Sequence, residues 1–265
     1  MPNPAILQRG EDGIVVIEKA AATPKSCCHH HAPQTPNNGQ PMAIEQLLVE
    51  LRGAFEAEKA QGHVINNRQE PESFKRMNTK SYGTCNGGDW QRFALFNDIH
   101  YVRNLVEANE DFELIVICWK AGQVSRVHNH DASHCWLTVL DGDMKEVQYQ
   151  RVGSQATAAA VLAAATGAER AEPVGSAVVV EPTQINAMKV GDVGYINDHL
   201  ALHSVGCYLS PEDVQPAADS DSGWRQQGGV TLHLYSPPIR RVKIYEENAV
   251  TERTPGYYSK GGVRV

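Results

Sequence analysis

Three histidines and one cysteine lie close together between Gly122 and Gly142. His128 and His130 are separated by a single residue, and the side chains of a β-strand alternate between its two faces. The spacing therefore predicts that both imidazoles point to the same side of a strand, where one metal ion can contact both. His134 is expected on the opposite face and is interpreted as a structural residue.

A third ligand is required, because an H-x-H pattern also occurs on ordinary strands. His203 follows a second strand-rich run and lies twelve positions after Gly191, which is expected to form a turn. Three neutral imidazoles without a carboxylate would leave a divalent metal with its full charge and with open coordination positions. Such a centre favours an anionic ligand, and a substrate thiolate fits. The spacing does not distinguish among iron, zinc, manganese and copper.

The elements that must position these histidines are short apolar runs, which begin at residue 93 and alternate with turn-forming residues. β-Branched and aromatic residues are frequent in the runs, as is typical of strands. The pattern predicts an all-β-dominated fold, either a sandwich or a barrel. The runs are F-A-L-F at 93–96, Y-V-R-N-L-V at 101–106, F-E-L-I-V-I-C-W at 112–119, K-E-V-Q-Y at 145–149, S-A-V-V-V-E at 176–181, V-G-Y-I-N-D at 193–198 and G-V-T-L-H-L-Y-S at 229–236.

An amphipathic helix is predicted from Met42 onward, and a second short helix is expected in the polar segment 62–92. In the first helix, apolar residues recur at helical spacing and acidic residues fall mostly on the other face. This helix is expected to cover one side of the domain. Its apolar residues are Ile44, Leu47, Leu48, Leu51, Ala54 and Phe55.

Residues 1–41 are predicted to form a flexible arm, and residues 42–265 a single domain. The arm is rich in proline and cannot bury enough apolar area to offset the entropy of ordering. Its C-C-H-H-H sequence at 27–31 is interpreted as an adventitious chelator. Two insertions into the domain are expected, an alanine-rich one near 152–176 and an acidic one near 209–228.

The charge balance argues against nucleic acid and anionic membranes as partners. The chain has 24 Lys and Arg against 31 Asp and Glu, a net charge of -7, so its field does not attract phosphates. No secretory signal and no apolar run of about 20 residues is present. We therefore expect a soluble, cytoplasmic monomer that acts on a small molecule.

Two segments resemble the two cupin motifs: residues 122–142 resemble the first, and residues 191–203 resemble the second with its proline and inner glycine replaced. Cupins are double-sheet jelly-roll β-barrels that hold one metal inside the barrel. Where many cupins carry a metal-binding glutamate, this sequence has Cys135. The resemblance implies a cupin-type double-sheet jelly-roll β-barrel with N-terminal helices.

Four motifs in the same order resemble the cysteine dioxygenases, and the similarity spans roughly residues 95–240. It implies a mononuclear non-haem Fe(II) that adds both atoms of O₂ to the sulfur of L-cysteine, giving cysteine sulfinic acid. L-cysteine and O₂ are the partners so implied. The motifs are Y-V-R-N-L-V, C-W-x-x-G-x-x-S-x-V-H-x-H-x-x-S-H-C, Y-I-N-D-x-x-x-L-H and L-H-L-Y-S-P-P.

The resemblance assigns roles residue by residue. Arg103 matches the arginine that holds the substrate carboxylate, for which its planar fork is suited, and Tyr101 matches a residue that lines the same substrate-binding pocket. Tyr235 matches the catalytic tyrosine, and His233 matches its companion in the substrate site. Thr231 stands where the family often has serine. The metal ligands correspond to His128, His130 and His203.

The resemblance also implies a covalent role for Cys135. In eukaryotic-type members this cysteine is joined by a thioether to the tyrosine of the L-H-L-Y motif, and the sequence has both Cys135 and Tyr235. A Cys135–Tyr235 thioether is therefore implied. The other five cysteines are expected to be reduced thiols, because a chain of this size does not need disulfides for stability.

Two alternatives to this assignment exist. The first is a dioxygenase for another small thiol such as 3-mercaptopropionate, although relatives with that activity tend to carry glutamine where this chain has Arg103. The second is a metal-binding cupin without turnover that acts as a sensor or store. Activity with the two thiols, measured beside metal analysis, distinguishes the three functions.

Overall fold

The computed structural model describes residues 41–62, 82–83, 86–154, 178–208, 228–246 and 249–265. The arm predicted over 1–41 lies outside these ranges apart from Pro41, as do most of both expected insertions and most of the segment assigned to a second helix. Their predicted structures stay predictions. Within the described ranges, no helix is both long enough and apolar enough to span a membrane.

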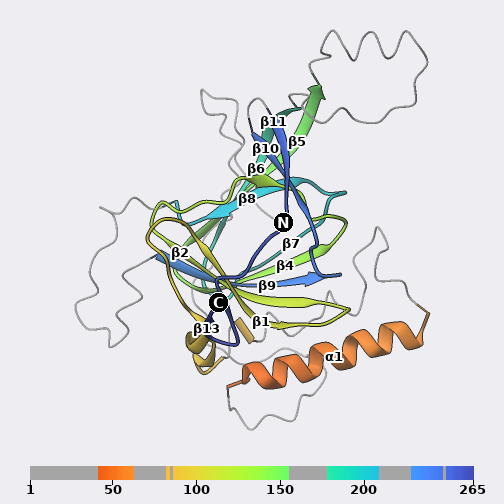
Figure 1. The fold of residues 1–265 in the computed structure, drawn as a ribbon, viewed down its shortest axis with the longest axis vertical. Coiled ribbons are helices and arrows are strands. Elements are labelled where there is room, and N and C mark those ends of the chain that lie inside the picture. The colour runs from red at the N-terminus through yellow and green to blue at the C-terminus, as the bar shows by residue number, and fades with distance from the viewer. Residues whose placement is uncertain (1–40, 63–81, 84–85, 155–177, 209–227, 247–248) are drawn as a thin grey trace, which may run out of the picture.

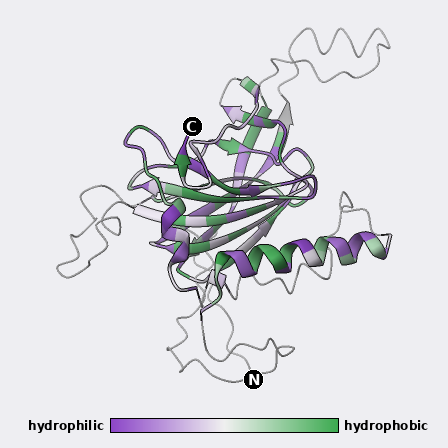
Figure 2. Cartoon of the chain, turned by 60° about the horizontal axis from the view of Figure 1, so that its bottom comes forward, coloured by the Kyte–Doolittle hydropathy of each residue, from purple (hydrophilic) through white to green (hydrophobic). Residues whose placement is uncertain are grey.

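Helix α1 (Ile44–Ala60) confirms the amphipathic helix predicted from Met42. Its apolar positions recur every three to four residues, so the helix buries one stripe and exposes the rest, and Figure 2 shows hydrophobic and hydrophilic segments alternating along it. Asp89 of the 3₁₀ helix η1 (Asp89–Phe93) accepts the backbone N–H of Ile44 at 2.6 Å, which satisfies one of the helix's free N-terminal donors. The buried stripe consists of Ile44, Leu47, Leu51 and Phe55.

Two β-sheets form the body of the domain (Figure 1), and their strands are mostly antiparallel. The seven-stranded sheet has the order β13 (Val263–Arg264), β12 (Ser259–Lys260), β1 (Val102–Ala108), β2 (Glu113–Lys120), β9 (Gly228–Ser236), β4 (His134–Asp141) and β7 (Val193–Ile196). The six-stranded sheet has the order β11 (Ala249–Arg253), β10 (Val242–Glu246), β3 (Val127–His128), β8 (Leu202–Gly206), β5 (Met144–Ser154) and β6 (Val178–Met188). This arrangement confirms the predicted all-β, cupin-type double-sheet fold.

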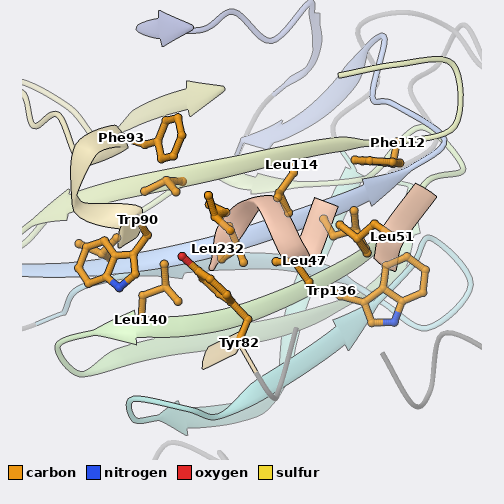
Figure 3. Close-up of a cluster of buried hydrophobic side chains, with 14 of the residues drawn as sticks. Leu47, Leu51, Tyr82, Trp90, Phe93, Phe112, Leu114, Trp136, Leu140 and Leu232 are labelled. Atoms are coloured by element: carbon orange, nitrogen blue, oxygen red, sulfur yellow. The ribbon is translucent and has the colours of Figure 1, made fainter. Parts of the chain in front are cut away.

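The central strands of the seven-stranded sheet, β2, β9 and β4, are buried on both faces. Leu114 and Leu232 belong to one core with Leu47 and Leu51, so α1 covers the outer face of this sheet, as Figure 3 shows. The alternate residues of β2 and β4 form a second core inside the barrel. Burial on both faces explains why β2 and β4 read as continuous apolar runs rather than alternating ones. The second core includes Ile115, Ile117, Trp119, Leu137, Val139 and Tyr235.

The structure corrects two strand predictions. F-A-L-F at 93–96 is not a strand, because Phe93 ends the helix η1 and the next residues are irregular. β5 continues to Ser154, so a strand occupies the first residues assigned to the alanine-rich insertion. The sequence interpretation also missed β11, β12 and β13, whose residues pair at sheet edges and lack a continuous apolar pattern.

Candidate metal centre and its pocket

The three predicted histidine ligands meet inside the barrel. His128 ends β3 and pairs in register with His203 on β8, while His130 follows in the connection after β3. Their ligand atoms all lie within 4.8 Å of one another, and the Nε2 atoms of His130 and His203 are 3.0 Å apart. Within the described ranges, no other group of three or more His, Cys, Asp or Glu side chains could hold a metal.

The prediction that both histidines of the H-x-H pattern lie on one strand is wrong for His130. β3 ends at His128, and the chain then turns at Asp131 and Ala132, whose φ angles are 54° and 64°. The Asp198 carboxylate stabilises this turn by accepting the backbone N–H groups of His130 at 2.6 Å and Ala132 at 2.9 Å. The ring centroids of His128 and His130 are nevertheless only 5.3 Å apart.

The second nitrogen of each ligand faces an acceptor, which orients the ring. Nδ1 of His203 lies 2.8 Å from Oε1 of Glu146, and Nδ1 of His128 lies 2.8 Å from the carbonyl oxygen of Arg126. Nδ1 of His130 lies 3.6 Å from Asp198 and is buried without a hydrogen-bond partner. These contacts leave the Nε2 atoms for a metal, in the arrangement usual for metal-binding histidines.

Burial keeps the imidazoles neutral. It lowers the pKa of His128 to about 3, and the neighbouring His130 adds to this effect. Burial, and then His203, lower the pKa of His130 to about 4. The pKa of His203 is also lowered by burial, which outweighs the opposing effect of its bond to Glu146. Because a metal binds the neutral form of imidazole, the residues present fit a divalent metal at neutral pH.

Cys135 and Tyr235 are neighbours across two strands of the barrel interior. They pair directly in the register of β4 and β9, so both side chains point to the same face. Both are buried, and burial is the main reason why the pKa of the Tyr235 hydroxyl lies well above its ordinary value. Tyr235 therefore keeps its proton and can donate a hydrogen bond.

A chain of hydrogen bonds fixes the Tyr235 hydroxyl. The hydroxyl lies 3.0 Å from Nδ1 of His233, whose Nε2 lies 2.9 Å from the Thr231 hydroxyl. The Trp119 indole N–H donates to the same hydroxyl at 2.9 Å. Burial holds the pKa of His233 well below its ordinary value, so this ring is neutral. Tyr101 completes the group by stacking on Trp119, with ring centroids 4.4 Å apart.

A cavity of about 760 Å³ opens beside the metal centre. The predicted ligand His128, the predicted substrate residues Arg103 and Tyr101, and Tyr235 all line it. His233 does not line the cavity and reaches it only through Tyr235. The structure thus brings the predicted residues together around one cavity, with His130, His203 and Cys135 behind its wall.

Four residues of this site were not identified from the sequence. Glu146 and Asp198 contact the histidine ligands, as described above, while Glu113 and Tyr257 contact Arg103. Their partners lie on distant segments, so local spacing does not indicate these contacts, although Asp198 belongs to the Y-I-N-D motif. One feature of the sequence could have indicated Glu113: it is the acidic residue within the otherwise apolar run 112–119.

Comparison with known proteins gives one family. Residues 72–248 match the family described as cysteine dioxygenase type I. The cysteine dioxygenase type 1 of Danio rerio is 28% identical over 228 residues, which cover 85% of this chain and 90% of the relative. The enzyme of Rattus norvegicus is 27% identical and covers 68% of this chain and 73% of its own, and that of Homo sapiens is 27% identical with 66% and 72% covered.

Proposed function

The chain belongs to the cysteine dioxygenase type I family and is a thiol dioxygenase, and from this premise we propose that it uses ferrous iron to convert L-cysteine and O₂ to cysteine sulfinic acid. Both oxygen atoms are added to the sulfur, so thiol and O₂ together account for the product. The observation that carries the proposal is a centre of three neutral histidines without a carboxylate ligand, beside a cavity that Arg103 and Tyr235 line.

We propose that His128, His130 and His203 hold the iron. The Nε2 atoms of His130 and His203 lie 3.0 Å apart, and Glu146 and the Arg126 carbonyl keep two of the three rings in place. When bound, ferrous iron supplies the reducing centre at which thiol and O₂ react. The absence of a carboxylate among these ligands leaves room for the charge of a thiolate.

Arg103 and Tyr101 are proposed to bind the carboxylate of the substrate. The Nε–H of Arg103 is buried and has no partner, so it is a donor that awaits an acceptor. Burial raises the pKa of Tyr101, which therefore remains a phenol and can donate to the same carboxylate. A guanidinium with a neighbouring hydroxyl suits an amino acid better than a thiol without a carboxylate.

Tyr235 is proposed to orient the substrate or the oxygen by hydrogen bonding, with His233 and Thr231 fixing the direction of its hydroxyl. We further propose a thioether between Cys135 and Tyr235. Its formation joins sulfur to the ring carbon beside the hydroxyl and removes two hydrogens, which O₂ accepts. Intact mass and peptide mapping should find the Cys135 and Tyr235 peptides joined, with two hydrogens lost. Cys135→Ser should abolish this cross-link.

Turnover tests the assignment. Iron-loaded protein is mixed with L-cysteine without O₂, then exposed to O₂, and the sulfinate is quantified by mass spectrometry with labelled O₂. Both oxygen atoms of the sulfinate group should carry the label. The same protein loaded with zinc serves as the control. Absence of sulfinate from protein with full iron occupancy would refute the proposal, and sulfinate from 3-mercaptopropionate alone would reassign the substrate.

The location, oligomeric state and partners of the protein are also proposals. We propose a cytoplasmic monomer that takes neither nucleic acid nor membranes as partners, supported by the net charge of -7. Light scattering of the purified protein measures the mass directly. A mass of two chains, or retention on anionic vesicles at physiological salt, would contradict it.

A further inference from the structure

Glu113 is a buried carboxylate at the wall of the substrate cavity. Its side chain is 1% exposed. In the register of β2 and β9 it lies directly opposite Tyr235, so it shares the interior face with the catalytic tyrosine. Its alternate neighbours along the strand, Ile115 and Ile117, are apolar core residues. A carboxylate in such surroundings is costly unless it is paired.

Three donors from three separate segments satisfy this carboxylate. Nη2 of Arg103 on β1 donates to its Oε1 at 3.2 Å, and the backbone N–H of Ile239, after β9, donates to the same oxygen at 3.4 Å. The Tyr257 hydroxyl, between β11 and β12, donates to Oε2. Burial and the Glu113 carboxylate raise the pKa of Tyr257 to about 12, so this donor keeps its proton.

The guanidinium of Arg103 is consequently held along one edge only. Within the described part of the chain, Glu113 is the only carboxylate that pairs with it. The aromatic rings of Tyr235 and Tyr257 flank the guanidinium, with their centroids 5.6 Å and 5.8 Å from its central carbon. The Nε–H on another part of the fork has no partner. Glu113 thus holds one nitrogen and leaves further donors for the cavity.

We propose that Glu113 is a positioning residue for Arg103: it fixes the guanidinium for the substrate carboxylate, and its negative charge limits how tightly that carboxylate is bound. The inference rests on the proposed role of Arg103 in substrate binding. Once the substrate is bound, one guanidinium serves two carboxylates. The geometry therefore favours substrate binding, while the repulsion between the carboxylates opposes it.

Two substitutions separate these effects. Glu113→Gln has the same shape and keeps all three contacts, since its carbonyl oxygen accepts from Arg103 and Ile239 while the Tyr257 hydroxyl turns to accept from its amide. It removes only the charge. Glu113→Ala removes the charge and the contacts together. The difference between the two variants measures the positioning of Arg103.

The experiment measures the affinities of iron-loaded protein for L-cysteine and for cysteamine by calorimetry without O₂. Cysteamine has the thiol and the amine but no carboxylate, so it does not use Arg103. Glu113→Gln should lower the Kd for cysteine about 3- to 10-fold, and Glu113→Ala should bind cysteine at least about 10-fold more weakly than Glu113→Gln. Cysteamine binding should change less than about 2-fold in both, as expected for a ligand without the charged contact.

A matched control and a further variant keep the test decisive. Glu58 is also buried, at 4% exposure on α1, and Glu58→Gln should leave both affinities unchanged. If Glu113→Ala does not fold, Tyr257→Phe replaces it, because it keeps the Glu113 charge and removes one contact; it should weaken cysteine binding about 3-fold and spare cysteamine.

Equal effects on cysteine and cysteamine would overturn the inference, because they would indicate general damage to the site. Equal cysteine affinities of Glu113→Gln and Glu113→Ala would overturn the positioning role. Equal affinities of the wild-type protein for cysteine and for cysteamine would also overturn the inference. Binding requires no turnover, so failure to form sulfinate refutes the dioxygenase proposal without affecting this comparison.

Discussion

The proposed binding of the substrate by Arg103 depends on both the charge and the shape of its guanidinium. Its fork is held by Glu113 on one nitrogen and has a buried, unpaired Nε–H on another. A substrate carboxylate would satisfy that donor and form charge-assisted hydrogen bonds, which are stronger than neutral ones. The loss of such contacts affects binding before it affects chemistry, because the residue that holds a carboxylate does not touch the reacting sulfur.

Arg103→Ala should raise the KM for L-cysteine about 100-fold, the value expected for losing a charge-assisted, two-pronged contact. Arg103→Lys should recover only part of this loss, because lysine lacks the fork. Steady-state kinetics with oxygen uptake measure both. Arg241→Ala is the control, since Arg241 is exposed and pairs with Glu252 at the surface. An unchanged KM in Arg103→Ala would remove this residue from the pocket.

Glu146 contacts His203, one of the three proposed metal ligands, and would act on a bound metal through it. Its Oε1 lies 2.8 Å from Nδ1 of His203, and the amides of Gln148 and Asn186 donate to its Oε2. Glu146→Gln should weaken metal binding about 10- to 100-fold, because the carboxylate that orients the ligand is lost. Metal content after dialysis against a chelator series measures the change. Glu181→Gln, on the exposed edge strand β6, should retain the metal as the wild type does.

At the scale of elements, α1 matters for the sheet that it covers rather than for the chemistry. Phe55 is fully buried and stacks on Phe112, with ring centroids 5.1 Å apart. Phe112 directly precedes β2, the strand that carries Glu113. The contact therefore anchors the helix to the outer face of the sheet, and residues on the inner face of that sheet line the cavity.

Phe55→Ala should lower the free energy of unfolding by about 3–5 kcal/mol, the cost of a cavity plus the lost burial of an aromatic ring. Denaturant unfolding measures it. Val49→Ala on the same helix should have little effect, because Val49 is 58% exposed. Turnover per folded molecule should be unchanged at low temperature. A fall in kcat without a loss of stability would contradict a purely structural role for α1.

In the molecule as a whole, a shared apolar core joins the two sheets, and polar contacts near the candidate metal centre add to it. Asp198 follows β7 of the seven-stranded sheet and binds the backbone after β3 of the six-stranded sheet. Burial alone would raise the pKa of Asp198, but the nearby His130 ring and the hydrogen bonds from the backbone N–H groups of residues 130 and 132 lower it to about 2. The ionised carboxylate thus stabilises the folded state.

The sign of this effect predicts how stability depends on pH. The folded pKa lies below the ordinary value of 3.8, so the contribution is fully present above pH 3.8 and is lost as the pH falls toward 2. Thermal unfolding of metal-free protein between pH 7 and pH 2 measures it. Asp198→Asn should be less stable at pH 7 and should approach the wild type at low pH. A difference in Tm that is constant with pH would contradict this assignment.

The fold class and the candidate metal ligands could be predicted from the sequence, and the resemblance of its motifs to a family implied the activity. His128, His130 and His203 lie in local motifs. The run of short apolar strands predicts a sandwich or a barrel, and the double-sheet jelly roll is what the family resemblance implies. Arg103 and Tyr235 likewise lie in short motifs that are recognisable without a structure. The roles of Arg103 and Tyr235 follow from the family resemblance of these motifs, whereas spacing along a strand predicts only the face to which a side chain points.

The charged groups that support the site are apparent only from the tertiary structure. Glu113 and Tyr257 are 144 positions apart, and Asp198 meets His130 across 68 positions. β2 is buried on both faces, so its pattern did not tell which side Glu113 faces. His130 lies beyond β3 because a turn stabilised by Asp198 ends the strand. Such contacts depend on sheet pairing between distant segments, which no local spacing encodes.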